Sequence, residues 1–129
     1  MYLYQLDFKV RDYELDVQGI VNNSVYQNYL EHTRHEFLLA NNISFADLSK
    51  EGIDAVVARV EIAYKNSLRS GDEFVCKLNV TKEGPKYLFS QIIVRKSDEK
   101  ICVKAKITTV VVNRGVLMSQ FAPFDELIK

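Results

Sequence analysis

The sequence contains few of the residues that cross-link a chain, bind a metal or interrupt regular structure. It has two cysteines, two histidines, two prolines and five glycines among 129 residues. Neither Cys76 nor Cys102 has a histidine or a second cysteine at metal-ligand spacing, which excludes the usual zinc and redox motifs. Both are predicted to be small buried residues of a protein in a reducing compartment. We expect no metal ion and no cofactor.

Long apolar runs and an excess of either charge are also absent. No stretch approaches the ~20 apolar residues of a membrane-spanning helix. Residues 1–10 alternate polar and apolar positions and include Asp7, which does not fit a signal peptide. The formal net charge is zero, so no overall charge attracts nucleic acid or a membrane. We expect a cytoplasmic protein without nucleic-acid partners and without a membrane span.

Charge is nevertheless unevenly distributed along the chain. Residues 1–58 hold four basic and nine acidic residues, whereas residues 77–106 hold eight basic and three acidic ones. The basic segment could face a phosphorylated ligand, although lysines on solvated strand faces give the same pattern.

The length and the lack of repeats or Pro/Gly-rich linkers predict one domain over residues 1–129. Apolar and polar residues alternate over residues 4–10, which predicts a half-buried strand. Ser44, with Asp47 three residues later, predicts the start of a short second helix. Before it, four residues at helical spacing predict a helix of four or five turns that ends near Asn41: Tyr26, Leu30, Thr33 and Phe37.

From residue 54 onward the sequence predicts antiparallel strands, over residues 56–64, 73–82, 87–96 and 101–113. Gly115 suggests a short extension after the last strand, and Pro123 is suited to open a terminal helical turn. The order of one strand, one long helix and four strands predicts an α+β domain. In it, the helix packs on a five-stranded antiparallel sheet.

The stretch before the long helix carries the residues best suited to chemistry. Asp16 lies on a turn that contains Gly19, and Asn23 lies where the helix begins. A helix start presents N–H groups without intrahelical acceptors, and a carboxylate beside them can attack a carbonyl group while its oxygen is stabilised. The same residues also suit a purely structural lead-in, with Asn22 or Asn23 as N-cap and Gly19 relieving a tight turn.

The pattern Asp-x-x-Gly-x-Val-x-Asn-x-x-Tyr in this stretch resembles the hotdog-fold acyl-CoA thioesterases of the 4-hydroxybenzoyl-CoA thioesterase type. The resemblance implies a hotdog fold, in which the sheet wraps the long helix and two protomers pair edge to edge. It also implies an acyl-CoA substrate and a homodimer or homotetramer. It covers essentially the whole chain, including the later strands, and is carried best by these residues: Asp16, Gly19, Val21, Asn23, Tyr26, Tyr29, Glu31, Arg34 and Phe37.

The same resemblance implies roles for two of these residues. Asp16 would act as a nucleophile or as the general base for a water, and the backbone N–H of Asn23 would hold the thioester oxygen. Some relatives carry Tyr or His in place of Asn23, which leaves the backbone role intact. A thiolate leaves without a strong general acid, so one carboxylate and these donors suffice. The two histidines and the lack of a Gly-x-Ser-x-Gly motif argue against a Ser-His-Asp triad.

Six residues are expected to bind substrate, some of which also have a structural interpretation. Tyr26 also suits the core, and Glu31 also suits a solvated or interface position on the helix. Basic residues near a strand turn would hold the coenzyme A phosphates, although the family's three consecutive basic residues are replaced here by Gly84-Pro85-Lys86. The six residues are Gly19, Tyr26, Glu31, Arg59, Lys82 and Lys86, of which Lys86 fits the phosphate-binding place best and Arg59 is a weaker candidate.

Two other functions are compatible with this pattern. An acyl carrier protein thioester shares the phosphopantetheine arm of coenzyme A, and a non-catalytic module could bind acyl thioesters without cleaving them. A hotdog dehydratase is disfavoured because it needs a histidine base, and neither His32 nor His35 precedes a glycine-containing turn. Both histidines are expected to lie at the surface or at an interface.

Overall fold

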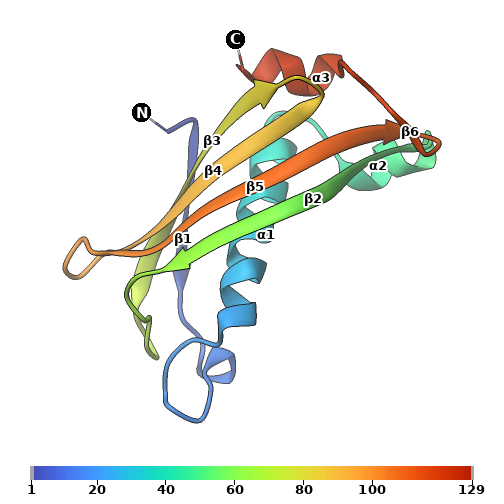
Figure 1. Cartoon of the computed structure of the whole chain (residues 1–129). Coiled ribbons are helices and arrows are strands. Elements are labelled where there is room, and N and C mark those ends of the chain that lie inside the picture. Colours follow the sequence, from blue (N-terminus) through green and yellow to red (C-terminus); the bar gives the residue numbers. More distant parts are fainter. Residues whose placement is uncertain (1, 129) are drawn as a thin grey trace.

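A computed structural model describes residues 2–128 (Figure 1). The helices are α1 (Asn23–Ala40), α2 (Phe45–Lys50) and α3 (Ala122–Asp125), with 3-10 turns at Asp12–Glu14 and Glu126–Ile128. The strands are β1 (Tyr4–Lys9), β2 (Ile53–Tyr64), β3 (Glu73–Glu83), β4 (Lys86–Arg95), β5 (Ile101–Asn113) and β6 (Val116–Leu117).

The strands form one curved antiparallel sheet, in the order β1-β3-β4-β5-β2, with the short β6 paired to β5. The long helix α1 lies across the inner face of this sheet (Figure 1). The expected arrangement of a long helix on five antiparallel strands is therefore confirmed. The extension suggested by Gly115 is the two-residue strand β6, which follows a turn where Gly115 has φ 81°.

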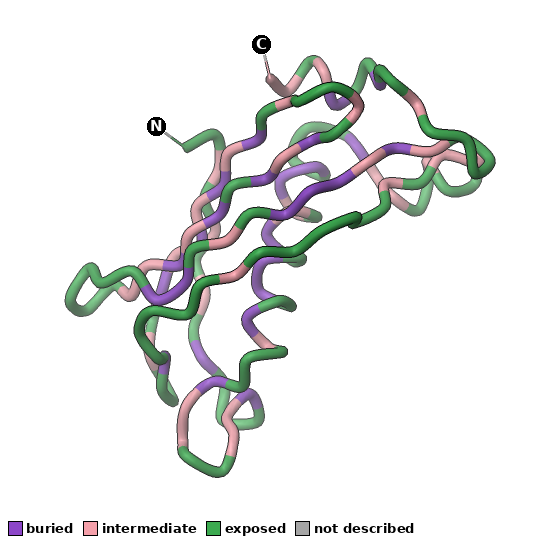
Figure 2. Tube along the Cα trace, viewed as in Figure 1, coloured by how far each residue is buried: buried purple, intermediate pink, exposed green. Residues whose placement is uncertain are grey.

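Helix α1 forms where the spacing of apolar residues predicts it. The four residues that carry that spacing are all buried, and the neighbouring Tyr29 and Leu38 are buried with them. Asn22 is the N-cap, since its side chain accepts a hydrogen bond from the Ser24 N–H. Ser44 likewise caps α2 by accepting from the Asp47 N–H. The apolar face of α1 therefore fills the concavity of the sheet, as the buried positions of Figure 2 show.

Strand β2 is the one that the core covers least. It pairs with β5 along one edge, and most of its residues are exposed (Figure 2). Four large apolar side chains of this strand remain exposed: Val56, Val57, Val60 and Tyr64. A long edge strand with apolar side chains is a template for pairing with another strand.

The C-terminal segment with α3 packs over one end of the core. Phe121 and Phe124 are buried, and the Tyr87 hydroxyl donates to Asp125 Oδ1 at 2.7 Å. The Lys82 ammonium also lies 2.9 Å from that oxygen. Within residues 2–128, no helix has the length and apolar character needed to cross a membrane.

Candidate active site

The loop before α1 is a narrow turn fixed by its own backbone. Leu15 and Val21 form a bridge across it, and the Asp16 N–H donates to the Ile20 carbonyl at 2.8 Å. The Gly19 N–H donates to the Asp16 carbonyl at 3.1 Å. Gly19 has φ 78°, a left-handed conformation that glycine adopts without strain. These bonds hold Asp16 opposite Ile20, on the loop that leads into α1.

The Asp16 carboxylate is anchored through a single oxygen. Its Oδ1 accepts from the Gln18 N–H at 2.8 Å and from the Ile20 N–H at 3.4 Å. Within the described part of the chain, Oδ2 has no hydrogen-bond donor and no cation in ion-pair contact. The residue is partly exposed. One oxygen therefore fixes the group, while the other is available to a substrate or a water.

The first N–H of α1 is also available. Asn22 Oδ1 and the Asn22 carbonyl accept from the Ser24 and Val25 N–H groups, at 3.1 and 2.9 Å. The N–H of Asn23, the first helical residue, has no acceptor among residues 2–128. The Tyr64 hydroxyl donates to the Asn23 carbonyl at 3.4 Å, so this residue is held from the strand side.

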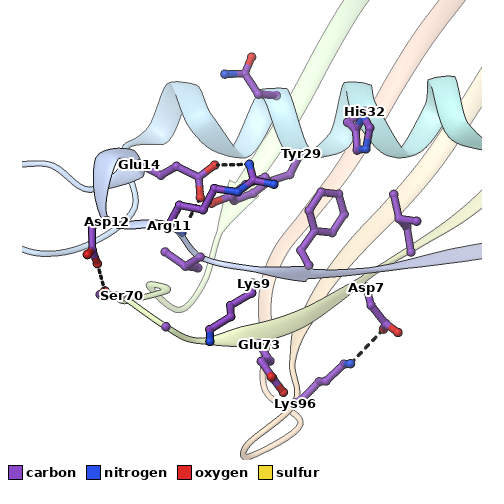
Figure 3. Close-up of a pocket in the computed structure, with 15 residues that line it drawn as sticks. Asp7, Lys9, Arg11, Asp12, Glu14, Tyr29, His32, Ser70, Glu73 and Lys96 are labelled. Carbon is purple, nitrogen blue, oxygen red and sulfur yellow. Dashed lines mark hydrogen bonds and ion pairs between the residues drawn. The ribbon is translucent and has the colours of Figure 1, made fainter.

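A buried carboxylate that the sequence does not single out supports this loop. Glu14 is 8% exposed, and its Oε1 accepts from the Tyr29 hydroxyl and the Arg11 N–H, both at 2.8 Å (Figure 3). Its carbonyl accepts from the Asn22 N–H at 3.1 Å. Burial and the neighbouring Glu14 raise the pKa of Tyr29, which keeps its hydroxyl a donor. Glu14 thereby ties the loop to α1.

Glu14 also lines the groove shown in Figure 3, whereas Asp16 does not. The groove has a volume of about 1040 Å³ and lies between β1 and α1. Its charged side chains are of both signs and only some are paired: Lys96 lies 3.1 Å from Asp7, and Asp12 is hydrogen-bonded to Ser70. The groove therefore has no excess of positive charge for a phosphate.

Two further cavities, of about 460 and 220 Å³, follow α1 on the side of β2. They share Glu31, Arg34 and Val57 in their walls, and together we call them the α1–β2 furrow. Glu31 is exposed and lies 3.7 Å from His35. The smaller cavity begins at Gln27, one turn after the helix start. The furrow is therefore a path along α1 away from Asn23.

The other residues expected to bind substrate lie at different places. Tyr26 is buried; its hydroxyl accepts from the Leu68 N–H at 2.9 Å, and its ring contacts those of Tyr29 and Tyr64. Arg59 is exposed on β2, 3.1 Å from Glu61. The structure thus gathers Asp16, Gly19, Asn23 and Tyr26 at one end of the fold, with Glu31 further along α1.

The two lysines expected at the coenzyme A phosphates lie near the β3–β4 turn, at the opposite end of the sheet from the Asp16 loop (Figure 1). Lys82 is paired with Asp125, which leaves Lys86 the more available cation. The histidines are exposed, and His32 lies 3.7 Å from Glu36. Among the described residues, no cluster of three or more histidine, cysteine or acidic side chains could hold a metal ion.

Comparison with known proteins matches residues 10–129 to the thioesterase-like superfamily. The chain is 35% identical over 104 residues to the chloroplastic acyl-acyl carrier protein thioesterase ATL3 of Arabidopsis thaliana, covering 80% of this chain and 55% of that protein. It is 30% identical over 110 residues to the long-chain acyl-CoA thioesterase FadM of Escherichia coli, covering 84% and 83%. It matches the crystal structure of a hypothetical protein from Aquifex aeolicus with a TM-score of 0.89 and 28% identity, covering 98% and 99%.

The chain spans just over half the length of ATL3 and of a second Arabidopsis relative, ATL2. The family match nevertheless extends over nearly the whole chain. Helix, sheet order and family agree with the fold that the sequence pattern implies. This chain has the hotdog fold and belongs to the thioesterase-like superfamily.

Proposed function

We propose that this chain is a thioesterase that hydrolyses acyl-CoA to a free acid and coenzyme A. One observation carries the proposal. The Asp16 carboxylate has one anchored and one available oxygen, on a loop that leads into a helix whose first N–H, from Asn23, has no acceptor among the described residues. That pairing supplies both a base or nucleophile and an oxyanion donor.

Two routes use the same groups. In the general-base route, Asp16 takes a proton from a water, whose oxygen forms a bond to the thioester carbon. In the nucleophilic route, Asp16 itself attacks, forming an anhydride that water then cleaves. In both, the Asn23 N–H stabilises the developing oxyanion, and the C–S bond breaks to release a thiolate that needs little protonation. Gly19 holds the turn, and Tyr26 supports the helix start.

We propose a homodimer formed through the open edge of β2, with a homotetramer of paired dimers as the alternative. The exposed apolar side chains of β2 favour such pairing, since it would remove them from water. Within one chain, Lys86 lies far from Asp16. In the dimer, Lys86 and the less available Lys82 would therefore bind the phosphates of the substrate held in the partner's active site. Arg59, on the paired strand, is the third phosphate candidate.

The acyl carrier in the substrate is the point on which the relatives differ. FadM is described as a long-chain acyl-CoA thioesterase and ATL3 as an acyl-acyl carrier protein thioesterase. The second is our alternative, and comparing kcat/KM for one acyl group on the two carriers separates them. A single domain over residues 1–129 and a cytoplasmic location stay predictions; the two buried, unbridged cysteines support the latter.

The test follows thiol release from acyl-CoA with a thiol reagent. Asp16→Asn should fold normally and lose most turnover, because the amide neither accepts a proton nor attacks well. Asp47→Asn, the same change on the exposed part of α2, is the control and should keep wild-type turnover. Near-full activity of Asp16→Asn would overturn the assignment. Binding of acyl-CoA without any thiol release by the wild type would favour a non-catalytic binding module.

A further inference from the structure

Arg34 is a partly buried cation without a carboxylate in ion-pair contact among the described residues. Its Nη1 donates to Gln91 Oε1 at 3.0 Å, and no acidic group of residues 2–128 lies within 4.0 Å of its guanidinium nitrogens. Gln91 is itself buried, and its Nε2 donates to the Leu30 carbonyl at 3.0 Å. Burial lowers the pKa of Arg34, as expected for a charge removed from water. The guanidinium is thus held in a fixed place by a neutral partner.

Most of the hydrogen-bonding capacity of this group is unused. A guanidinium has five N–H donors, and one of them is engaged by Gln91. No fully buried side-chain nitrogen among the described residues lacks a partner. The remaining donors of Arg34 must therefore open into accessible space. A partly desolvated cation with unpaired donors is costly, so an oxygen brought to those donors would be stabilised.

That space is the α1–β2 furrow. Arg34 belongs to the walls of both of its cavities and stands where they adjoin. On the side of the helix start the wall is formed by Gln27, Leu30 and Val60. Beyond Arg34 the larger cavity is mainly apolar, with Leu38, Phe45, Phe89 and Phe124. The other titratable groups facing the furrow are Glu31, His35 and Asp54.

The geometry of α1 gives the distance from a thioester bound at Asn23 to the Arg34 guanidinium. Arg34 lies eleven residues after Asn23, about 16 Å along the axis. Its side chain points back toward the helix start by roughly 5 Å. An extended hydrocarbon advances about 1.25 Å per carbon, given C–C bonds of about 1.5 Å, so about eight to ten carbons span the remaining distance.

We propose that Arg34 is a specificity-determining residue that binds an oxygen on the acyl chain remote from the thioester, about eight to ten carbons away. The substrates it favours would be medium-chain acyl thioesters with a terminal hydroxyl or carboxylate. This proposal rests on the thioesterase function and adds the substrate class. A carboxylate would accept two hydrogen bonds from the guanidinium fork, and a hydroxyl one.

The test compares three ten-carbon CoA esters that differ in their oxygen: decanoyl, 10-hydroxydecanoyl and 9-carboxynonanoyl. The wild type should have the higher kcat/KM for the two oxygenated esters. Arg34→Met should lower the ratio of oxygenated to plain substrate about tenfold or more, and Arg34→Lys should lower it less. Lys104→Met removes a charge from the outer face of the sheet and should leave the ratio unchanged.

A second variant tests the same prediction without removing Arg34, so the result does not depend on whether Arg34→Met folds. Gln91→Glu leaves Arg34 in place and supplies a carboxylate that occupies it, so the ratio should fall here too. The melting temperature of wild type and variants with decanoic or decanedioic acid gives an independent readout: only the wild type should be stabilised more by the diacid.

The outcomes separate the two proposals. If the wild type hydrolyses decanoyl-CoA but neither variant changes the ratio, the Arg34 proposal is wrong and the thioesterase proposal stands. If no ester is hydrolysed, the thioesterase proposal fails, and the melting temperatures still decide whether Arg34 selects a remote oxygen.

Discussion

Replacement of Tyr29 by phenylalanine removes the hydroxyl that donates to Glu14 at 2.8 Å and little else. The ring would keep its contacts with Phe8 and Phe74, whose centroids lie 5.3 and 4.8 Å away. A hydrogen bond to a charged, buried acceptor contributes about 1.5–3 kcal/mol. Glu14 retains the Arg11 N–H as a donor, which favours the lower half of this range. We therefore expect a loss of about 2 kcal/mol in the free energy of unfolding.

Thermal and urea denaturation measure this effect. For a domain of this size, 2 kcal/mol corresponds to a fall in Tm of about 8 °C. Because the same contact ties the Asp16 loop to α1, kcat should also fall, by up to about tenfold. Tyr13→Phe, on the same segment but with a 79% exposed side chain, should change the stability by less than about 0.5 kcal/mol. If Tyr29→Phe were as stable as Tyr13→Phe, the Glu14 anchor would be refuted.

Three further predictions concern the turn at Gly19, the C-terminal segment that contains Asp125, and the exposed edge strand β2. Gly19→Ala should cost about 1–2 kcal/mol and lower kcat, because φ 78° strains any residue with a Cβ, although the Cβ itself meets no atom within 4 Å. Hydrogen bonds from Tyr87 and Lys82 hold the pKa of Asp125 below its usual range. Asp125→Asn should therefore destabilise the protein at neutral pH, and its difference from wild type should begin to shrink as the pH falls below about 4 and vanish only below the lowered pKa of folded Asp125. Val60→Asp should convert the expected dimer to monomers in size-exclusion chromatography.

Each of these changes has a matched control. Gly71 has the same φ of 78° and equally open surroundings, so Gly71→Ala should cost similar stability and spare kcat. Asp47→Asn, on the exposed part of α2, should change the free energy of unfolding at neutral pH by less than about 0.5 kcal/mol. Val116 is exposed on the two-residue β6, and Val116→Asp should not alter the oligomeric state. Identical kcat for the two glycine variants, or identical elution of the two valine variants, would contradict the reasoning.

Local signals in the sequence were sufficient to predict the elements and the loop. Helix α1 follows from the spacing of its apolar residues, and its start follows from the capping preference of Asn22. The turn at Gly19 and the cap at Ser44 also depend on neighbours within a few residues. Such features can be predicted because their energies arise from interactions close in sequence.

The environment of Glu14 and Arg34 could not be predicted in this way. Glu14 lies in a polar segment, and its burial depends on Tyr29, fifteen residues later. Arg34 is held by Gln91, 57 residues away on β4. Placing Lys86 far from Asp16 likewise requires the strand order, which sequence spacing does not specify. These three features depend on contacts between segments far apart in the sequence, which the local sequence pattern does not specify.

The most direct test of the central claim is a crystal structure of Asp16→Asn with an acyl-CoA bound. Our account predicts the thioester oxygen about 2.7–3.1 Å from the Asn23 backbone nitrogen, with the residue at position 16 facing the thioester carbon. An acyl-CoA whose thioester lies away from the start of α1, with the Asn23 N–H bound to water or to protein instead, would contradict it.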